Sequence, residues 1–206
     1  MKLNTLEDLL LQQVKDLCYA EKQLTKAIPK MAKAAQSVEL KSALEDHLKE
    51  TREHVARLEE VFGLMGAPAK PQRCAAMDGI IEEGSEMIDA EGDPDVIDAG
   101  LIAAAQRVEH YEIAGYGCAR AFAQRLGLTE VVDLLTSTLE EEGAADKTLT
   151  QLAESEVNDS AAKSEDGEND QVPAPRQKGR AAGTSNGKAR MPSRTGGRGR
   201  AGAGSR

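Results

Sequence analysis

The chain of 206 residues is rich in charged side chains, at 30%, and poor in aromatic ones, at 2%. This composition favours helices, because strands are enriched in aromatic and β-branched residues. Three cysteines without a Cys-x-x-Cys pair argue against a disulfide framework and predict a reducing, cytoplasmic compartment. The absence of a long apolar run excludes a membrane span, and the early Glu7 and Asp8 argue against a signal peptide.

The formal net charge of −9 conceals two segments of opposite sign. Residues 158–206 contain ten Lys and Arg against five Asp and Glu, a balance of +5, which leaves −14 on residues 1–157. The C-terminal segment is also rich in Gly, Ser, Pro and Ala, so it lacks the apolar surface that would offset its ordering entropy. We therefore expect a folded body over 1–157 and a disordered basic tail over 158–206.

The first half of the body predicts two long helices. Thr5 is a good N-cap for a helix that runs to about Ala35. Pro29 lies inside this helix and predicts a kink or an earlier end, because an interior proline removes a backbone hydrogen bond. A second helix is expected over Glu39–Met65, with Gly66 as the residue that terminates it.

The second half repeats this layout after a longer connection. Two prolines make Ala67–Gln72 a loop, and Cys74–Ala90 has the pattern of a shorter helix. A third long helix is expected over Pro94–Arg125, with a proline in its first turn and Gly127 at its end. We expect the fourth long helix to run from an N-cap at Thr129 to about Glu156.

Two tight helical hairpins separated by one long connection predict an all-α fold. The connection spans about 28 residues and contains a short helix of its own. A four-helix bundle with one long crossover is the layout of ferritin-like folds.

Carboxylates interrupt the apolar faces of these helices. Ala105, Glu109, Glu112 and Tyr116 are spaced by 4, 3 and 4 residues, so they lie on one face of the third long helix. Acidic side chains are rarely buried unless they are paired or bind a metal, because desolvating a charge costs several kcal/mol. These glutamates therefore need a compensating partner.

The carboxylates on the apolar helix faces lie at matching distances from the two predicted turns. Glu21 and Glu50 lie 15 and 14 residues from the turn near residue 36, and Glu112 and Glu142 each lie 15 residues from Gly127. Since antiparallel helices rise equally on either side of a turn, each hairpin brings its two carboxylates to one height. Packing the hairpins together predicts one acidic layer in the core.

A second set of polar residues falls near this layer. Glu109 and Asp146 lie at similar distances from the second turn, and His54 lies at the corresponding distance from the first. Carboxylates and imidazoles are ligands of iron and manganese, and two divalent cations would neutralise such a layer. His47 is equally consistent with a metal ligand and with a hydrogen-bond partner of one. The candidate metal ligands are Glu21, Glu50, Glu109, Glu112, Glu142, His47, His54 and Asp146.

The match to known dimetal bundles is imperfect, because neither Glu50 nor Glu142 is followed by a histidine three residues later. Two other interpretations remain open. The glutamates could form buried ion pairs, or the assigned faces could be one position out of register, which would leave the carboxylates in solvent.

Several short motifs also resemble those of a known family, in the order expected for it. They are AEKQL at 20–24, HLKET at 47–51, CAAM at 74–77, AAAQRVEHYE at 103–112, and LEEE at 139–142 followed by Asp146. Over residues 1–157 they resemble the YciE/YciF family of bacterial ferritin-like proteins. The resemblance implies a rubrerythrin-like bundle with a dimetal centre, a homodimer and an association with stress responses. It implies no demonstrated reaction and does not extend to the basic tail.

Two classes of function follow from this pattern. One is redox chemistry at a di-iron or dimanganese site with peroxide, oxygen or Fe²⁺, without a defined organic substrate. The other is a non-catalytic stress or partner-binding protein with a structural metal or none. In either case the Arg/Gly repeat at 196–200 predicts electrostatic binding of nucleic acid by the tail, with a merely solubilising tail as the alternative.

Overall fold

The computed structural model describes residues 2–164, and this part of the chain is built from helices. The elements are α1 (Leu6–Ala34), α2 (Val38–Leu64), α3 (Ala75–Ile88), α4 (Pro94–Leu126), α5 (Thr129–Leu152), the π-helical turn η1 (Ala153–Val157) and α6 (Asn158–Ser164). The predicted all-α class is therefore confirmed, and the helix bounds agree with the sequence pattern to within a few residues.

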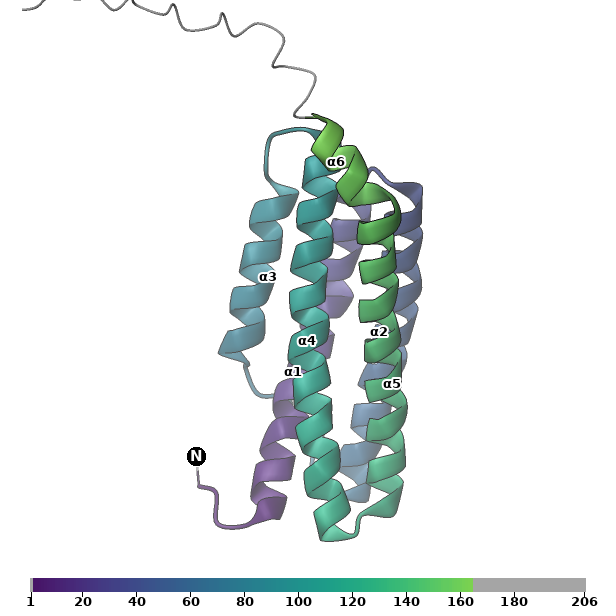
Figure 1. Ribbon diagram of the computed structural model, residues 1–206. Helices are drawn as coiled ribbons and strands as arrows, with labels where there is room; N and C mark the ends of the chain where they lie inside the picture. The colour runs from purple at the N-terminus through teal and green to yellow at the C-terminus, as the bar shows by residue number, and fades with distance from the viewer. Residues whose placement is uncertain (1, 165–206) are drawn as a thin grey trace, which may run out of the picture. The chain divides into compact units, whose positions relative to one another are not determined.

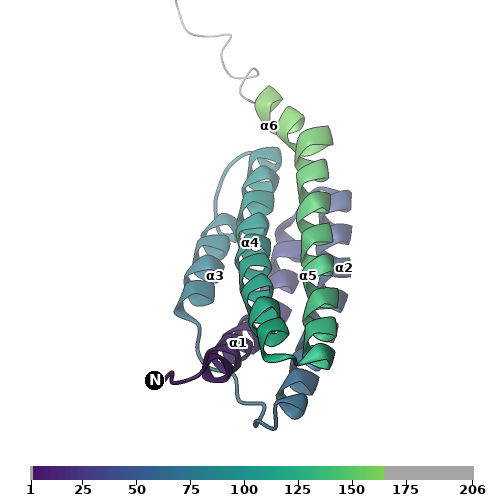
Figure 2. The same ribbon diagram turned by 60° about the horizontal axis from the view of Figure 1, so that its bottom comes forward.

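The four long helices form an antiparallel bundle (Figures 1 and 2). α1 and α2 make one hairpin, α4 and α5 make the other, and contacts of α2 with α5 and of α1 with α4 join the two. The crossover from α2 to α4 carries α3, which packs on the outside of α1 and α4 (Figure 1). This is the expected ferritin-like bundle with one long crossover and a short extra helix.

The helix ends follow local capping rules, with one exception. Thr5 and Asp8 form a reciprocal capping box, which confirms the predicted start of α1. Gly127 adopts the left-handed conformation, with φ of 74°, and ends α4 as predicted. The prediction that Thr129 caps α5 is wrong: the N-cap is Leu128, which makes no side-chain hydrogen bond. The turn is so short that Thr129 is already helical.

The expectation that the first helix runs to about Ala35 is confirmed: α1 continues through Pro29 to Ala34, and the alternative of an earlier end is excluded. The expectation for the tail needs correction. Residues 158–164, which the composition assigned to the tail, form α6. This helix contacts α4, and Val157 just before it is buried, so packing orders a stretch whose composition alone is polar. The rest of the predicted tail lies outside the described residues.

A buried aspartate links the two hairpins at one end of the bundle. The carboxylate of Asp98, in the first turns of α4, accepts hydrogen bonds from the backbone N–H groups of Gln36 (3.0 Å) and Ser37 (2.6 Å). These residues form the turn between α1 and α2, whose donors would otherwise lack partners. Asp98 therefore fixes the height of α4 relative to the first hairpin.

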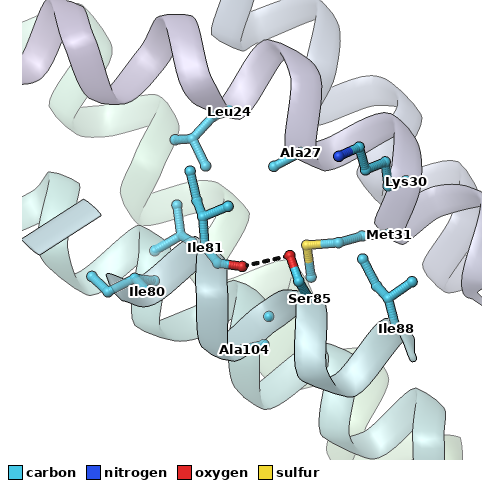
Figure 3. Close-up of a pocket in the computed structure, with 11 residues that line it drawn as sticks. Leu24, Ala27, Lys30, Met31, Ile80, Ile81, Ser85, Ile88 and Ala104 are labelled. Carbon is cyan, nitrogen blue, oxygen red and sulfur yellow. Dashed lines mark hydrogen bonds between the residues drawn. The ribbon is translucent and has the colours of Figure 1, made fainter. Parts of the chain in front are cut away.

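The apolar core is divided into two clusters, one toward each end of the bundle. The first includes Leu24, Leu40 and Leu101, and the side chains of α3 pack against it. A small apolar cavity of about 30 Å³ remains where α3 covers α1 and α4, between Met31, Ile81 and neighbouring residues (Figure 3). The second cluster gathers residues from the opposite ends of the long helices, such as Leu10, Phe62, Tyr116 and Leu135.

Candidate metal centre

A layer of ionisable side chains lies between the two apolar clusters, near the middle of every long helix. Its six members are between 0% and 8% exposed: Glu21 from α1, His47 and His54 from α2, Glu109 and Glu112 from α4, and Glu142 from α5. Acidic side chains are almost never buried this completely without a partner. The predicted acidic layer therefore exists, with two histidines in it.

The two groups of potential ligands in this layer share one residue. His47, Glu109, Glu112 and Glu142 each offer an atom within 4.8 Å of the others, and so do Glu21, His54 and Glu142. Each group combines carboxylate oxygens with one imidazole nitrogen. Glu142 belongs to both groups, so its carboxylate lies between two neighbouring sites that could each hold a cation.

The inward-facing histidine nitrogens lie close to carboxylate oxygens of the layer. His54 Nδ1 lies 3.0 Å from Glu142 Oε1, and His47 Nε2 lies 3.4 Å from Glu109 Oε1. Neither nitrogen has a hydrogen-bond partner within residues 2–164, and the same holds for both carboxylate oxygens of Glu112 and of Glu142. Buried polar atoms are normally satisfied, so this many unsatisfied atoms at one place call for a ligand.

The outward-facing nitrogen of His54 is held by a second carboxylate. His54 Nε2 lies 2.8 Å from Glu141 Oε2, and the guanidinium of Arg57 donates to the same carboxylate. With its proton on Nε2, the imidazole presents the lone pair of Nδ1 to the layer, as metal-binding histidines do. Arg57 and Glu141 were not among the candidate residues, although each lies within one turn of a ligand candidate in the sequence.

Tyr116, in the turn of α4 after Glu112, orients the glutamate that α1 contributes to the layer. Its hydroxyl donates a hydrogen bond of 2.5 Å to Glu21 Oε1. The bond leaves Glu21 Oε2 as the unpartnered oxygen. Both the glutamate of α1 and the second histidine of α2 are therefore oriented by residues outside the layer.

The electrostatics of the layer favour proton retention when no cation is bound. Burial raises the pKa of Glu109 to about 8 despite the nearby His47, and burial together with Glu21 and Glu142 raises the pKa of Glu112 well above its ordinary value. Burial alone would lower the pKa of His54, but Glu142 and Glu21 raise it to about 10. Without a cation, the layer therefore reduces its negative charge by keeping protons on its carboxyl groups and imidazoles.

Burial would likewise lower the pKa of His47. The carboxylates of Glu50, Glu109 and Glu142 more than offset this effect and raise the pKa to about 9. Without a bound cation, both imidazoles are therefore doubly protonated and positively charged at neutral pH.

The structure does not bring Glu50 and Asp146 into either group. The buried face of α2 passes through His47, Thr51 and His54, which places Glu50 beside that face with its side chain 48% exposed. Glu50 Oε2 lies 3.5 Å from His47 Nδ1, on the outer side of the ring. Asp146 is also partly exposed and accepts a hydrogen bond from Gln106.

The fold and this layer define a helical-bundle protein with a buried carboxylate–imidazole cluster. The family model described as a domain of unknown function, DUF892, matches residues 5–162. Protein YciF from Escherichia coli K12 is 43% identical over 162 residues, which is 78% of this chain and 98% of that protein. The chain therefore belongs to the DUF892 family, and its similarity to YciF confirms the resemblance that the motifs indicated.

Solved structures agree with this assignment. The crystal structure of the E. coli stress protein YciF matches with a TM-score of 0.73 at 43% identity, over 76% of this chain and 99% of that one. YcfI from Rhodopseudomonas palustris matches with a TM-score of 0.71 at 44% identity, over 72% and 95% of the two chains. A protein from Xanthomonas campestris shares the fold at 20% identity, with a TM-score of 0.62 over 78% and 99%.

The helices were compared with the length and hydropathy of membrane-spanning segments. Across residues 2–164, none combines the length and the apolar character that crossing a bilayer requires.

Proposed function

We propose that the buried layer is a dimetal centre that binds two divalent cations. The observation that carries this proposal is the convergence of unpartnered buried ligand atoms from four helices on two adjoining groups. The charges also balance. Four ionised carboxylates and two neutral imidazoles carry four negative charges, and two divalent cations neutralise them.

The donor atoms indicate iron or manganese. The six ligands offer carboxylate oxygens and imidazole nitrogens but no thiolate, a set that suits these metals in helical bundles. When bound, such metals would supply redox chemistry with peroxide or oxygen, which would be the oxidant where Fe²⁺ is the substrate. The chain's own contribution is to exclude water through the apolar clusters and to orient His54 and Glu21 through Glu141 and Tyr116.

A second candidate function is a non-catalytic stress protein in which the cations are structural. The E. coli relative of known structure is described as a stress protein, which supports a stress-related role without naming a reaction. Apart from a cavity that reaches His47 and Glu109, the layer is closed to solvent, which restricts access by a reactant and favours this alternative. The two candidates share the same centre and differ only in turnover.

Metal analysis of the purified chain tests the proposal. Protein stripped with a chelator and reloaded anaerobically with Fe²⁺ or Mn²⁺ is expected to retain two metal ions per chain after desalting. The double variant Glu112→Gln/Glu142→Gln removes two charges without changing side-chain size and is expected to retain none, whereas Glu53→Gln/Glu60→Gln removes two exposed charges and is expected to retain both.

Peroxide or oxygen consumption by the loaded protein then separates the redox function from the structural one. Wild-type protein that folds normally but retains no metal contradicts both candidates.

Assembly, compartment and the tail remain expectations within the same proposal. A homodimer is tested by light scattering, and a cytoplasmic location agrees with the three free cysteines. Nucleic-acid binding by residues 165–206, outside the described part of the chain, is expected to weaken steeply with salt. A filter-binding assay that retains no DNA at low salt would exclude it.

A further inference from the structure

The acidic layer is buried, yet one cavity leads to it from the surface. This cavity of about 210 Å³ lies between α2 and α5 and is lined by Glu50 and His47 on one side and by Ala144 and Ala145 on the other. Glu109 also lines it. Since His47 and Glu109 belong to the layer, the cavity joins the protein surface to the first group of ligand atoms.

Small residues form part of the cavity wall. Ala43 on α2 and Ala144 and Ala145 on α5 line the cavity, and their short side chains leave space between the two helices. The cavity volume of about 210 Å³ is many times the space that one water molecule needs. The cavity can therefore admit water and a small hydrated cation.

The polar side chains that line the cavity range from exposed carboxylates at its mouth to buried ligand atoms at its inner end. At the mouth, Asp46 is 67% exposed and forms an ion pair with Lys49, whereas Glu50 is 48% exposed and lies 3.5 Å from Nδ1 of the buried His47. At the inner end, Glu109 Oε2 and His47 Nε2 are buried atoms without a hydrogen-bond partner in the described chain. A cation would thus pass from an exposed carboxylate to buried ligands that lack one.

We propose that this α2–α5 cavity is the port through which a hydrated divalent cation enters the centre. Glu50 attracts the cation at the mouth, and His47 and Glu109 receive it at the inner end. Glu50 is therefore an entry residue and not a ligand of the loaded centre. The inference rests on the proposed dimetal function and adds the route by which the centre is filled.

Loading kinetics test the port, with Co²⁺ as a spectroscopic probe mixed with metal-free protein in a stopped-flow instrument. Glu50→Gln keeps the shape and a hydrogen-bond acceptor for His47 but removes the charge. We expect it to slow loading by roughly three- to tenfold at low salt, and less at high salt, with the final stoichiometry unchanged.

A second variant tests the route by blocking it. Ala144→Leu places a larger side chain at an exposed position in the cavity wall and is expected to slow loading at every salt concentration. Matched controls are Glu53→Gln and Ala56→Leu, which make the same changes on α2 at positions that do not line the cavity. Both controls are expected to load at the wild-type rate.

Three results would overturn the port. If wild-type protein binds two metal ions and both port variants load as fast as it does, cations enter elsewhere and only the port is lost. If Glu50→Gln binds fewer metal ions at equilibrium, Glu50 is a ligand and its role as an entry residue is excluded. If wild-type protein binds no metal at all, the proposed dimetal function fails and the port fails with it.

Discussion

The middle of the bundle and its two ends are built from the same four helices but follow opposite rules. At the ends, side chains such as Leu10, Phe62 and Leu101 are removed from water and pack in clusters of hydrophobic residues. In the middle, Glu112 is removed from water just as completely, yet neither of its carboxylate oxygens has a hydrogen-bond partner within residues 2–164. Burial stabilises the ends and penalises the middle. The difference indicates that the middle is kept for binding and not for stability.

The sharpest test of this difference is the pH dependence of stability without metal. Raised pKa values, about 8 for Glu109 and about 9 and 10 for His47 and His54, mean that these groups favour folding when protonated. The contribution of Glu109 is complete below its unfolded value of 4.5 and is lost as the pH rises through about 8. Those of the histidines are complete below 6.5 and are lost through about 9 and 10.

The free energy of unfolding of the metal-free protein should therefore fall as the pH rises from about 5 to 10. Each unit of pKa difference is worth about 1.4 kcal/mol, so this is the largest effect expected. Urea titrations across this range measure it, and Glu109→Gln should flatten the part below pH 8. Metal-free stability that rises with pH would contradict the account.

Truncation of a buried apolar side chain at one end of the bundle should lower the free energy of unfolding by nearly as much as the pH change does. Phe62→Ala is expected to lower the free energy of unfolding by about 3–5 kcal/mol, because it leaves a cavity in the second apolar cluster. Since Phe62 takes no part in the layer, urea unfolding should show the same cost with and without bound metal. A cost that depends strongly on metal would mean that the ends and the middle are not independent.

Substitution of a carboxylate in the middle of the bundle should raise the free energy of unfolding of the metal-free protein. Glu112→Leu replaces a buried carboxyl group that has no hydrogen-bond partner among the described residues by an apolar side chain of similar volume. We expect it to raise the stability of metal-free protein by about 1–4 kcal/mol and to abolish the stabilisation that added metal gives the wild type. Thermal denaturation with and without Mn²⁺ measures both effects. Destabilisation of the metal-free protein would show that Glu112 already has a partner.

Asp98 sharpens the comparison because it is a buried carboxylate with partners. Its oxygens accept hydrogen bonds from the backbone of Gln36 and Ser37, unlike those of Glu112. Asp98→Ala is therefore expected to destabilise the protein by about 1–3 kcal/mol, with metal content unchanged. Equal effects of Asp98→Ala and Glu112→Leu in chemical denaturation would remove the distinction between satisfied and unsatisfied carboxylates.

The sequence predicted the bundle well because its signals are local. Thr5, Gly66 and Gly127 mark helix ends whatever the rest of the chain does, and the spacing of Glu109 and Glu112 places both on one face. Thr129 failed as a cap because the turn before it is too short, which only the packed hairpin determines.

Some features of the candidate site could not be obtained from spacing alone. Counting residues from a turn gives the height of Glu50 correctly but not its direction around the helix axis, and a step of one residue turns a side chain by about 100°. Thr51 takes the buried position instead. The contacts of Arg57 with Glu141 and of Asp98 with Gln36 join distant segments, so they appear only in the folded chain.

Anomalous diffraction from crystals of the Mn²⁺-loaded protein would test the central claim most directly. We expect two peaks inside the bundle, one near His47 and Glu109 and one near Glu21 and His54, with Glu142 between them. Peaks confined to the exposed carboxylates of Asp46 and Glu50, or no peak in the layer of a fully loaded sample, would contradict the claim.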